Sequence, residues 1–354
     1  MVEALGKSLR NLPGPVLITG HTGFKGTWMT LLFEHLQIPV VGYSLKPEKD
    51  SLYDRADLKG QIPEKFADIR NFKKLNKFLH IHQPSVIVHM AAQPLVLESY
   101  KIPRKTFEVN VMGTANLLDA AFHLPSVKVV VVVTTDKVYK NDNSKQSFIE
   151  INPLEGKDPY SASKVGTEAV VKAWQQISEV SGGPKVVSVR AGNVIGGGDF
   201  AKDRLIPDII RSCISMNPLE IRNPKGTRPW QHVLDVLTGY VLTIEKILEG
   251  HDLRALNFGP AKDSLNVLKI VEIARQTFSF TYKIKDRNVK KNTQKFEAKF
   301  LDLNSSLAYS KLNWKPKLSQ KDALTLTLNW WQKVLRNKVH PKKATLDEIY
   351  EFTS

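Results

Sequence analysis

Cysteine and long apolar runs are nearly absent from this sequence. Cys213 is the single cysteine in 354 residues, which excludes an intrachain disulfide and is typical of a reducing compartment. The longest apolar run, around residues 127–133, is far shorter than the ~20 residues of a membrane-spanning helix. Residues 1–14 lack the apolar stretch and cleavage site of a signal peptide. We therefore expect a cytoplasmic protein with no membrane anchor.

Acidic residues are also scarce relative to basic ones. The chain has 51 Lys and Arg against 35 Asp and Glu, a formal net charge of +16. A nucleic-acid binder is one explanation, but the positive residues are spread along the chain and the densest cluster, Arg287 with Lys290 and Lys291, is short. A basic surface also attracts anionic small molecules such as dinucleotides and sugar nucleotides. We expect no nucleic-acid partner, and a solvated lysine-rich surface is the simplest cause of the charge.

Short β-branched runs alternate with helix-length segments over the first half of the chain. Continuous apolar strands without alternation indicate a sheet that is covered on both faces, and strands separated by helices indicate a parallel sheet. The sequence thus predicts an α/β fold, a Rossmann-type doubly wound parallel sheet. The strands are predicted at 16–19, 39–43, 86–89, 127–134, 186–189 and 255–258, and helices at 27–37, 72–80 and 320–334.

A glycine-rich turn follows the first predicted strand and opens the first helix. Its glycines are three residues apart, which permits a tight turn and a close approach of backbone to a ligand. The free N–H groups at the start of the helix would face a pyrophosphate. This position in the chain predicts a dinucleotide site formed by Gly20, Thr22, Gly23, Phe24, Lys25 and Gly26. A glycine turn without a ligand is the alternative.

The usual acidic residue after the second strand is missing. An acid there holds the ribose hydroxyls of NAD, whereas a base suits the extra phosphate of NADP, so Lys46 leaves NADP open. Asp68 and Ile69, after the next short strand, are candidates for the adenine end of the site, with a solvent-facing loop aspartate as the alternative.

Beyond residue 195 the pattern loosens, with Gly196–Gly198 and several prolines between shorter elements. The length suggests about two domains of ~150 residues. We assign residues 1–195, with about 231–261, to the dinucleotide-binding domain. Residues 196–230 and 262–354 are assigned to a smaller C-terminal substrate-binding domain.

Tyr160 and Lys164 lie four residues apart, so a helix would place them on one face. A lysine beside a phenol stabilises the phenolate, and lowering the tyrosine pKa from ~10 toward ~7 would take about 4 kcal/mol. The tyrosine could then exchange a proton with a hydroxyl while a nicotinamide accepts a hydride. A surface pair without function is the alternative.

These motifs together resemble the extended short-chain dehydrogenase/reductases that act on nucleotide sugars. The segments 20–26, 190–199 and 228–233 are similar, in particular, to the branch that dehydrates CDP-glucose. The resemblance covers about residues 16–331 and implies NAD as the cofactor. Two positions depart from the pattern, since Leu97 replaces a usual arginine and Val138 a frequent cysteine.

The resemblance implies an internal redox dehydration of CDP-glucose to a 4-keto-6-deoxy sugar nucleotide. Tyr160, assisted by Lys164, would take the proton of the sugar 4-hydroxyl, and Thr135 would orient the substrate. Asp136 would be the acid for the leaving 6-hydroxyl, and Lys137, once it has lost its proton, the base at C5. An Asp136–Lys137 salt bridge without catalytic function is the alternative.

The remaining expected contacts also come from the resemblance. The cofactor would be bound by the glycine turn together with Asp68, Ile69, Ala91, Ala92, Gln93, Thr134, Tyr160 and Lys164. The substrate would be bound by Gln93, Asn193, Arg204 and Arg228, the last through a bidentate phosphate contact. Asn110 and His232 are expected to be structural, and no metal is expected.

Family members commonly pair through two helices, here residues 106–123 and 161–179, so a homodimer or homotetramer is expected. Two other functions stay open. A nucleotide-sugar 4-epimerase would need Tyr160, Lys164 and NAD but no base at C5, and a non-catalytic protein could sense NAD or a nucleotide.

Overall fold

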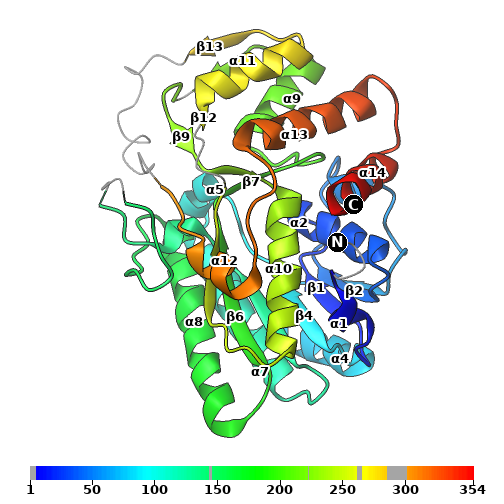
Figure 1. Ribbon diagram of the computed structural model, residues 1–354, viewed down its shortest axis with the longest axis vertical. Coiled ribbons are helices and arrows are strands. Elements are labelled where there is room, and N and C mark those ends of the chain that lie inside the picture. Colours follow the sequence, from blue (N-terminus) through cyan, green and yellow to red (C-terminus); the bar gives the residue numbers. More distant parts are fainter. Residues whose placement is uncertain (1–4, 143–145, 222, 261–264, 285–300) are drawn as a thin grey trace.

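Seven parallel strands form the centre of the protein (Figure 1, a computed structural model). The structure describes residues 5–142, 146–221, 223–260, 265–284 and 301–354, so the basic cluster at Arg287, Lys290 and Lys291 lies outside the described residues. The strand order is β3-β2-β1-β4-β5-β6-β11. The strands are β1 (Val16–Thr19), β2 (Val40–Ser44), β3 (Glu64–Phe66), β4 (Val86–His89), β5 (Val129–Val133), β6 (Lys185–Ala191) and β11 (Ala255–Phe258).

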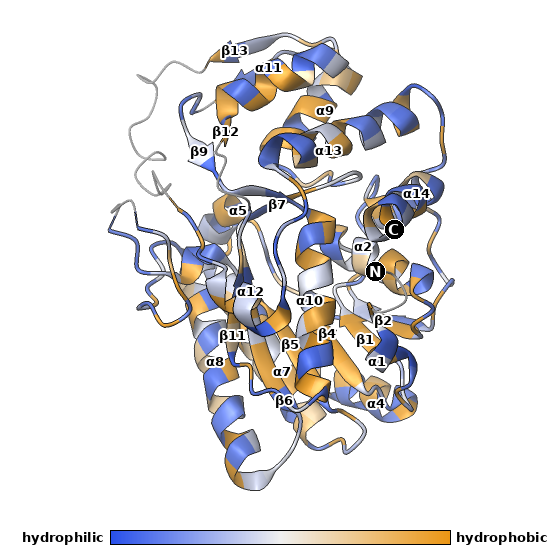
Figure 2. Ribbon diagram, viewed as in Figure 1, coloured by the Kyte–Doolittle hydropathy of each residue, from blue (hydrophilic) through white to orange (hydrophobic). Residues whose placement is uncertain are grey.

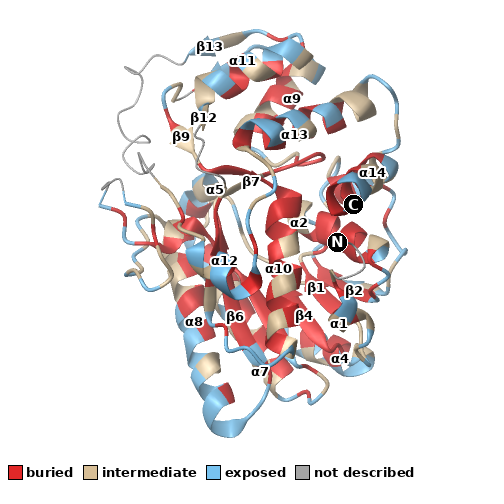
Figure 3. Cartoon of the chain, in the orientation of Figure 1, coloured by how far each residue is buried: buried red, intermediate tan, exposed pale blue. Residues whose placement is uncertain are grey.

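This order runs outward in both directions from β1 and β4, as in a doubly wound dinucleotide-binding sheet. The predicted fold class is therefore confirmed, and β3 joins the six strands whose ranges were predicted. The inner strands β1, β4 and β5 are apolar and buried, as the colours of Figures 2 and 3 show, whereas the edge strand β3 (Glu-Lys-Phe) is partly exposed.

Alternate residues of the strands belong to two separate cores, one on each face of the sheet. Val16 and Ile18 pack with α2 (Phe24–His35) and α10 (Val233–Leu248), whereas Leu17 packs with α4 (Phe72–His82), α7 (Gly113–Phe122) and α8 (Pro159–Ser181). Burial on both faces explains why the strands show no polar alternation.

The helix of the glycine turn begins at Phe24 and not at residue 27, because Gly23 is its N-cap. The predicted helix at 106–123 is also more complex. It comprises the end of α6 (Pro103–Phe107), a π-helical segment, Glu108–Met112, and α7. Wide turns of this kind are frequent at functional sites.

The smaller elements gather beyond the carboxyl ends of the strands, at the top of Figure 1. Three two-stranded sheets lie there, β7 (Asn193–Ile195) with β10 (Trp230–His232), β8 (Leu219–Ile221) with β13 (Tyr282–Ile284), and β9 (Thr227–Arg228) with β12 (Leu265–Asn266). The helices around them are α9 (Leu205–Ser215), α11 (Val267–Thr277) and α13 (Gln320–Leu335).

The remaining helices are α1 (Lys7–Arg10), α3 (Leu52–Arg55), α5 (Val96–Lys101), α12 (Ser306–Leu312) and α14 (Pro341–Thr353). Helix α12 packs on α10 and β11, and α14 packs on α2 and α3. The division of the chain at 196–230 and 262–354 stays a prediction.

No helix among the described residues is both long enough and apolar enough to cross a bilayer.

Candidate active site

The glycine turn connects β1 to α2 and has no room for a side chain at Gly20 or Gly26. A Cβ atom on Gly26 would lie 2.2 Å from the carbonyl oxygen of Gly20, and one on Gly20, whose φ is +76°, would lie 2.8 Å from the Ala91 nitrogen. Gly23 donates its N–H to the same Gly20 carbonyl at 3.0 Å. Thr22 shares a 2.7 Å hydrogen bond with Ser44 at the end of β2. This close-packed turn at a helix N-terminus fits the pyrophosphate of a dinucleotide.

A groove of about 540 Å³ lies beside Asp68, where the adenine end was predicted. Arg70 contacts the Asp68 carboxylate at 2.8 Å and Glu108 at 2.7 Å. The hydrogen bond with Arg70 lowers the pKa of Asp68, so this carboxylate stays ionised. Ile69 is buried beneath Gly113, where a Cβ atom would come within 2.6 Å of it. Lys46 is exposed beyond the end of β2.

Residues 91–93 leave the end of β4 directly beside the glycine turn. The backbone N–H of Gln93 donates to Asn110 at 2.8 Å, and the Asn110 amide donates back to the Gln93 carbonyl at 3.1 Å. Asn110 is therefore structural, as predicted. The Gln93 side chain also bonds within the chain, to Leu95 and Thr106, so its predicted contacts with ligands would compete with these bonds.

The predicted catalytic residues converge just beyond β5. The Tyr160 phenol hydrogen-bonds with Thr135, and the Thr135 hydroxyl donates to Asp136 at 3.0 Å. The Lys137 ammonium lies 3.5 Å from the Asp136 carboxylate, which is 1% exposed. The Asp136–Lys137 salt bridge, which was the alternative to a catalytic role, is thus present. A proton passed from Lys137 to Asp136 would turn this ion pair into a neutral base and a neutral acid without any change in net charge.

The structure differs from the sequence-based expectation for the tyrosine pKa. Burial raises the pKa of Tyr160 to about 12, and the hydrogen bond with Thr135 and the charge of Arg204 only partly oppose it. Lys164 donates to the Val133 carbonyl at 3.0 Å, whereas the phenol hydrogen-bonds with Thr135. The expected lowering of the tyrosine pKa by Lys164 is therefore wrong.

Several cations surround this cluster. Burial lowers the pKa of Lys164 to about 8, although the charge of Glu168 opposes the effect. Burial likewise lowers the pKa of Lys25 to about 7, and the charges of Lys164 and Arg204 act in the same direction. Arg204 itself contacts the buried Asp199 at 3.1 Å. These mutually repelling cations would bind an anion with favourable charge complementarity.

A buried ion pair behind the site was missed at the level of the sequence. Arg190 donates to both oxygens of Glu168, at 2.9 and 2.7 Å, and each side chain is 5% exposed. Thr134 donates its hydroxyl to the same carboxylate at 2.5 Å, so its predicted cofactor contact would compete with this bond. The spacing of Tyr160, Lys164 and Glu168 could have pointed to Glu168, because one helix face carries all three, but it gives no sign of Arg190.

The segment after β6 holds the predicted substrate residues Asn193, Arg204 and Arg228. Asn193 begins β7 and pairs with Trp230, and Arg228 donates to the Thr227 carbonyl at 2.8 Å. His232 is buried, accepts the Leu234 N–H at 3.3 Å and lies 3.0 Å from the Glu348 carboxylate. Its expected structural role is confirmed. Leu97, on α5, is 37% exposed.

The glycines at 196–198 serve packing. A Cβ atom on Gly197 would lie 2.1 Å from the Trp330 ring, and the Gly197 carbonyl accepts the Trp28 indole N–H at 2.9 Å. This joins α13 to α2 across the loop.

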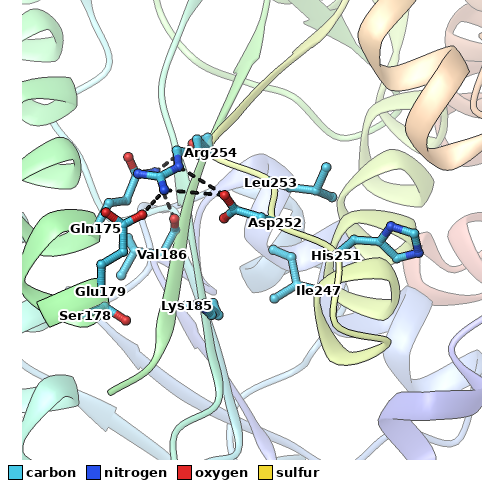
Figure 4. A pocket seen from close by; sticks show the side chains of 10 residues that line it. All are labelled: Gln175, Ser178, Glu179, Lys185, Val186, Ile247, His251, Asp252, Leu253 and Arg254. Atoms are coloured by element: carbon cyan, nitrogen blue, oxygen red, sulfur yellow. Dashed lines mark hydrogen bonds and ion pairs between the residues drawn. The ribbon is translucent and has the colours of Figure 1, made fainter. Parts of the chain in front are cut away.

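A second hollow lies at the amino ends of β6 and β11, far from these groups in the fold (Figure 4). Arg254 closes it with ion pairs to Glu179 and Asp252. Its volume of about 20 Å³ has room for a single water molecule. In the described part of the chain, no three His, Cys, Asp or Glu side chains are grouped as a metal site.

Residues 16–259 match the NAD dependent epimerase/dehydratase family. The chain belongs to this family. It is 37% identical over 334 residues to the CDP-glucose 4,6-dehydratase of Salmonella typhimurium, which covers 91% of this chain and 92% of that protein. The UDP-glucose 4-epimerase of Mycoplasma genitalium is 26% identical, over 74% of this chain and 81% of its own length.

The fold is also that of DesIV, a dTDP-glucose 4,6-dehydratase from Streptomyces venezuelae whose crystal structure contains NAD. The TM-score is 0.77 at 24% identity, over 93% of this chain and 99% of that one. Family membership confirms the predicted cofactor, NAD. The close-packed glycine turn and the groove at Asp68 fit this dinucleotide.

Proposed function

We propose that this protein is a nucleotide-sugar 4,6-dehydratase that converts CDP-glucose into CDP-4-keto-6-deoxyglucose and water. The observation that carries the proposal is the cluster of Tyr160, Thr135, Asp136 and Lys137 at the carboxyl end of β5. A dehydratase needs an acid and a base in addition to the tyrosine, and a 4-epimerase does not. The 37% identity to a CDP-glucose 4,6-dehydratase supports the same choice of reaction and of nucleotide.

Each side chain has a separate role in this proposal. NAD, held at the glycine turn, would supply a hydride acceptor for C4 and a hydride donor for C6. Tyr160, in its phenolate form, would accept the proton of the 4-hydroxyl, and Thr135, which contacts it, would orient the sugar. The proton that Asp136 gives to the leaving 6-hydroxyl comes from the Asp136–Lys137 pair, and Lys137 in its neutral form removes the C5 proton.

The substrate diphosphate would be bound by the cations around the cluster. Arg204 acts on Tyr160 through its charge, so it lies near the reacting groups. Asn193 and Arg228, in the adjoining small sheets, complete the proposed substrate contacts. The dinucleotide would lie along the glycine turn from Gly20 to Gly26, with its adenine end at Asp68.

We also propose a homodimer or homotetramer that pairs through residues 106–123 and 161–179, in the cytoplasm. Phe107 and Met112, on the first of these segments, are 41% and 55% exposed, and Val180, just beyond the second, is 87% exposed. Covering them in a dimer would bury apolar surface. Light scattering of the purified chain measures its mass in solution.

The decisive experiment is turnover of CDP-glucose in heavy water with added NAD. We expect a 6-deoxy-4-keto product that carries deuterium at C5. A CDP-galactose product without deuterium at C5 would instead identify an epimerase, and no product from CDP-, dTDP-, GDP- or UDP-glucose would favour a sensor.

The Lys137→Ala variant separates the two halves of the reaction. We expect C4 oxidation, followed as NADH absorbance, to persist, while elimination slows about 10²–10⁴-fold, as expected for loss of a positioned base. Lys140→Ala is the matched control, because Lys140 is exposed three residues away and pairs with Glu155. Normal turnover in Lys137→Ala would remove Lys137 from the mechanism.

A further inference from the structure

A buried chain of hydrogen bonds connects the glycine turn to the catalytic helix, and His89 stands in its middle. Thr19 and His89 are the last residues of β1 and β4 and are partners across these parallel strands. The Thr19 hydroxyl lies 2.6 Å from His89 Nδ1, and His89 Nε2 lies 3.0 Å from the Thr114 hydroxyl. All three side chains are at most 3% exposed.

The proton positions follow from counting donors and acceptors. The Thr19 hydroxyl oxygen accepts the backbone N–H groups of Met90 and Ala91, each at 3.2 Å, so its single proton is left for His89 Nδ1. Burial, with the charge of Lys164, lowers the pKa of His89 to about 3, so the ring is neutral. A neutral ring that accepts at Nδ1 carries its proton on Nε2 and donates it to Thr114.

The other end of the chain reaches α8. The Thr114 hydroxyl donates to the Asn110 carbonyl at 2.7 Å, and Thr167 of α8 donates to the same carbonyl at 2.8 Å. This carbonyl belongs to the π-helical segment. The Asn110 amide also donates to Ser163 at 2.8 Å, and Ser163 donates to the Tyr160 carbonyl at 2.7 Å.

We propose that His89 is a positioning residue, which, in its Nε2–H form, sets the spacing between the cofactor turn and the helix that carries Tyr160 and Lys164. One ring nitrogen holds the turn, because Thr19 contacts the Met90–Ala91 backbone against which Gly20 packs. The other nitrogen holds α8 through Thr114 and Asn110. A threonine or serine at position 89 could bond to only one of Thr19 and Thr114, whereas the imidazole bonds to both. The inference rests on the proposed function for its kinetic consequence.

Nitrogen NMR of the full chain, labelled with ¹⁵N-histidine, tests the assignment directly. The His89 ring signals are identified by their loss in His89→Asn. We expect a proton on Nε2 and a bare Nδ1 across the pH range in which the protein is folded and active. A proton on Nδ1, or a doubly protonated ring at pH 7, would overturn the proposal.

Two substitutions each preserve one side of the contact. His89→Asn places an oxygen near the position of Nδ1 and can still accept from Thr19, whereas His89→Gln reaches toward Thr114 and leaves Thr19 without its acceptor. We expect His89→Asn to retain NAD⁺ affinity within about twofold but to lose about tenfold in kcat, and His89→Gln to lose about tenfold in NAD⁺ affinity with a smaller change in kcat. His80→Asn, an exposed histidine on α4, is the control and should change neither.

A purely structural histidine would lower stability in both variants and change the two constants in parallel, so parallel changes refute the positioning role. NAD⁺ affinity, measured by fluorescence titration, and the NMR signals do not depend on the sugar. If no sugar nucleotide is turned over, the proposed function fails and these two measurements still decide the role of His89. If one variant does not fold, the other identifies the His89 ring signals by their loss, and the NMR of the unmodified chain still decides the tautomer.

Discussion

Replacing Arg190 with methionine should expose how much of this site depends on one buried ion pair. The guanidinium makes two bonds to Glu168 and further bonds to the Tyr139 hydroxyl at 2.8 Å and the Glu150 carbonyl at 2.9 Å. Arg190→Met removes all of them and leaves the buried Glu168 carboxylate without its directly bonded counter-ion. Breaking one partner of such a pair costs about 3–5 kcal/mol. We expect a loss of that size in the free energy of unfolding at pH 7.

The loss should depend on pH in a defined direction. Burial by itself would raise the pKa of Glu168, but the bonds and charge of Arg190 outweigh it and the net shift is downward. The paired carboxylate therefore adds stability above the unfolded pKa of ~4.3, and the native protein loses it as pH falls through the folded value. In Arg190→Met, Arg190 no longer lowers the pKa of Glu168, so the Glu168 carboxyl can take up a proton. The difference in the free energy of unfolding between the native protein and Arg190→Met should thus be smaller at pH 5 than at pH 7.

Urea unfolding, followed by tryptophan fluorescence at both pH values, measures these differences. Arg104→Met is the control, because Arg104 is 92% exposed in its pair with Glu108, and such pairs contribute about 0–1 kcal/mol. The double variant Glu168→Leu/Arg190→Met removes both charges and should be more stable than the sum of the single losses predicts. A loss below about 1 kcal/mol for Arg190→Met, or a loss equal at both pH values, would refute the reasoning.

Three further outcomes are expected. Gly26→Ala, whose Cβ would lie 2.2 Å from the Gly20 oxygen, should force a shift that costs about 1–3 kcal/mol and weakens NAD⁺ binding; an unchanged dissociation constant in fluorescence titration would contradict this. Tyr160→Phe should keep NAD⁺ affinity but reduce turnover of CDP-glucose about 10²–10⁴-fold, and turnover within twofold of the native rate would exclude the phenol as the acid–base group. Trp330→Ala should lower the free energy of unfolding by about 3–5 kcal/mol, because this fully buried ring packs on Gly197; urea unfolding measures it, and a loss below 1 kcal/mol would show that the loop collapses onto the cavity.

Most strands and the glycine turn were predictable from local sequence, and the candidate catalytic cluster was predicted with the help of the family resemblance. Valine runs such as β5 need two covered faces wherever they occur, so their position in a parallel sheet follows from composition. Tyr160 and Lys164 share a helix face by their spacing alone, and Thr135, Asp136 and Lys137 are consecutive at the end of a strand. In a doubly wound sheet, both groups belong at the carboxyl edge.

Long-range contacts decided the rest. Burial raises the pKa of Tyr160, whereas the spacing to Lys164 predicted that this pKa is lowered. Glu168 pairs with Arg190 on β6, and His89 bonds to Thr114 on α7. No local sequence pattern predicts either pair. Local periodicity determines which face of an element is apolar. Only the tertiary structure determines which buried polar groups bond to one another, because each needs a hydrogen-bond partner and that partner can come from any part of the chain.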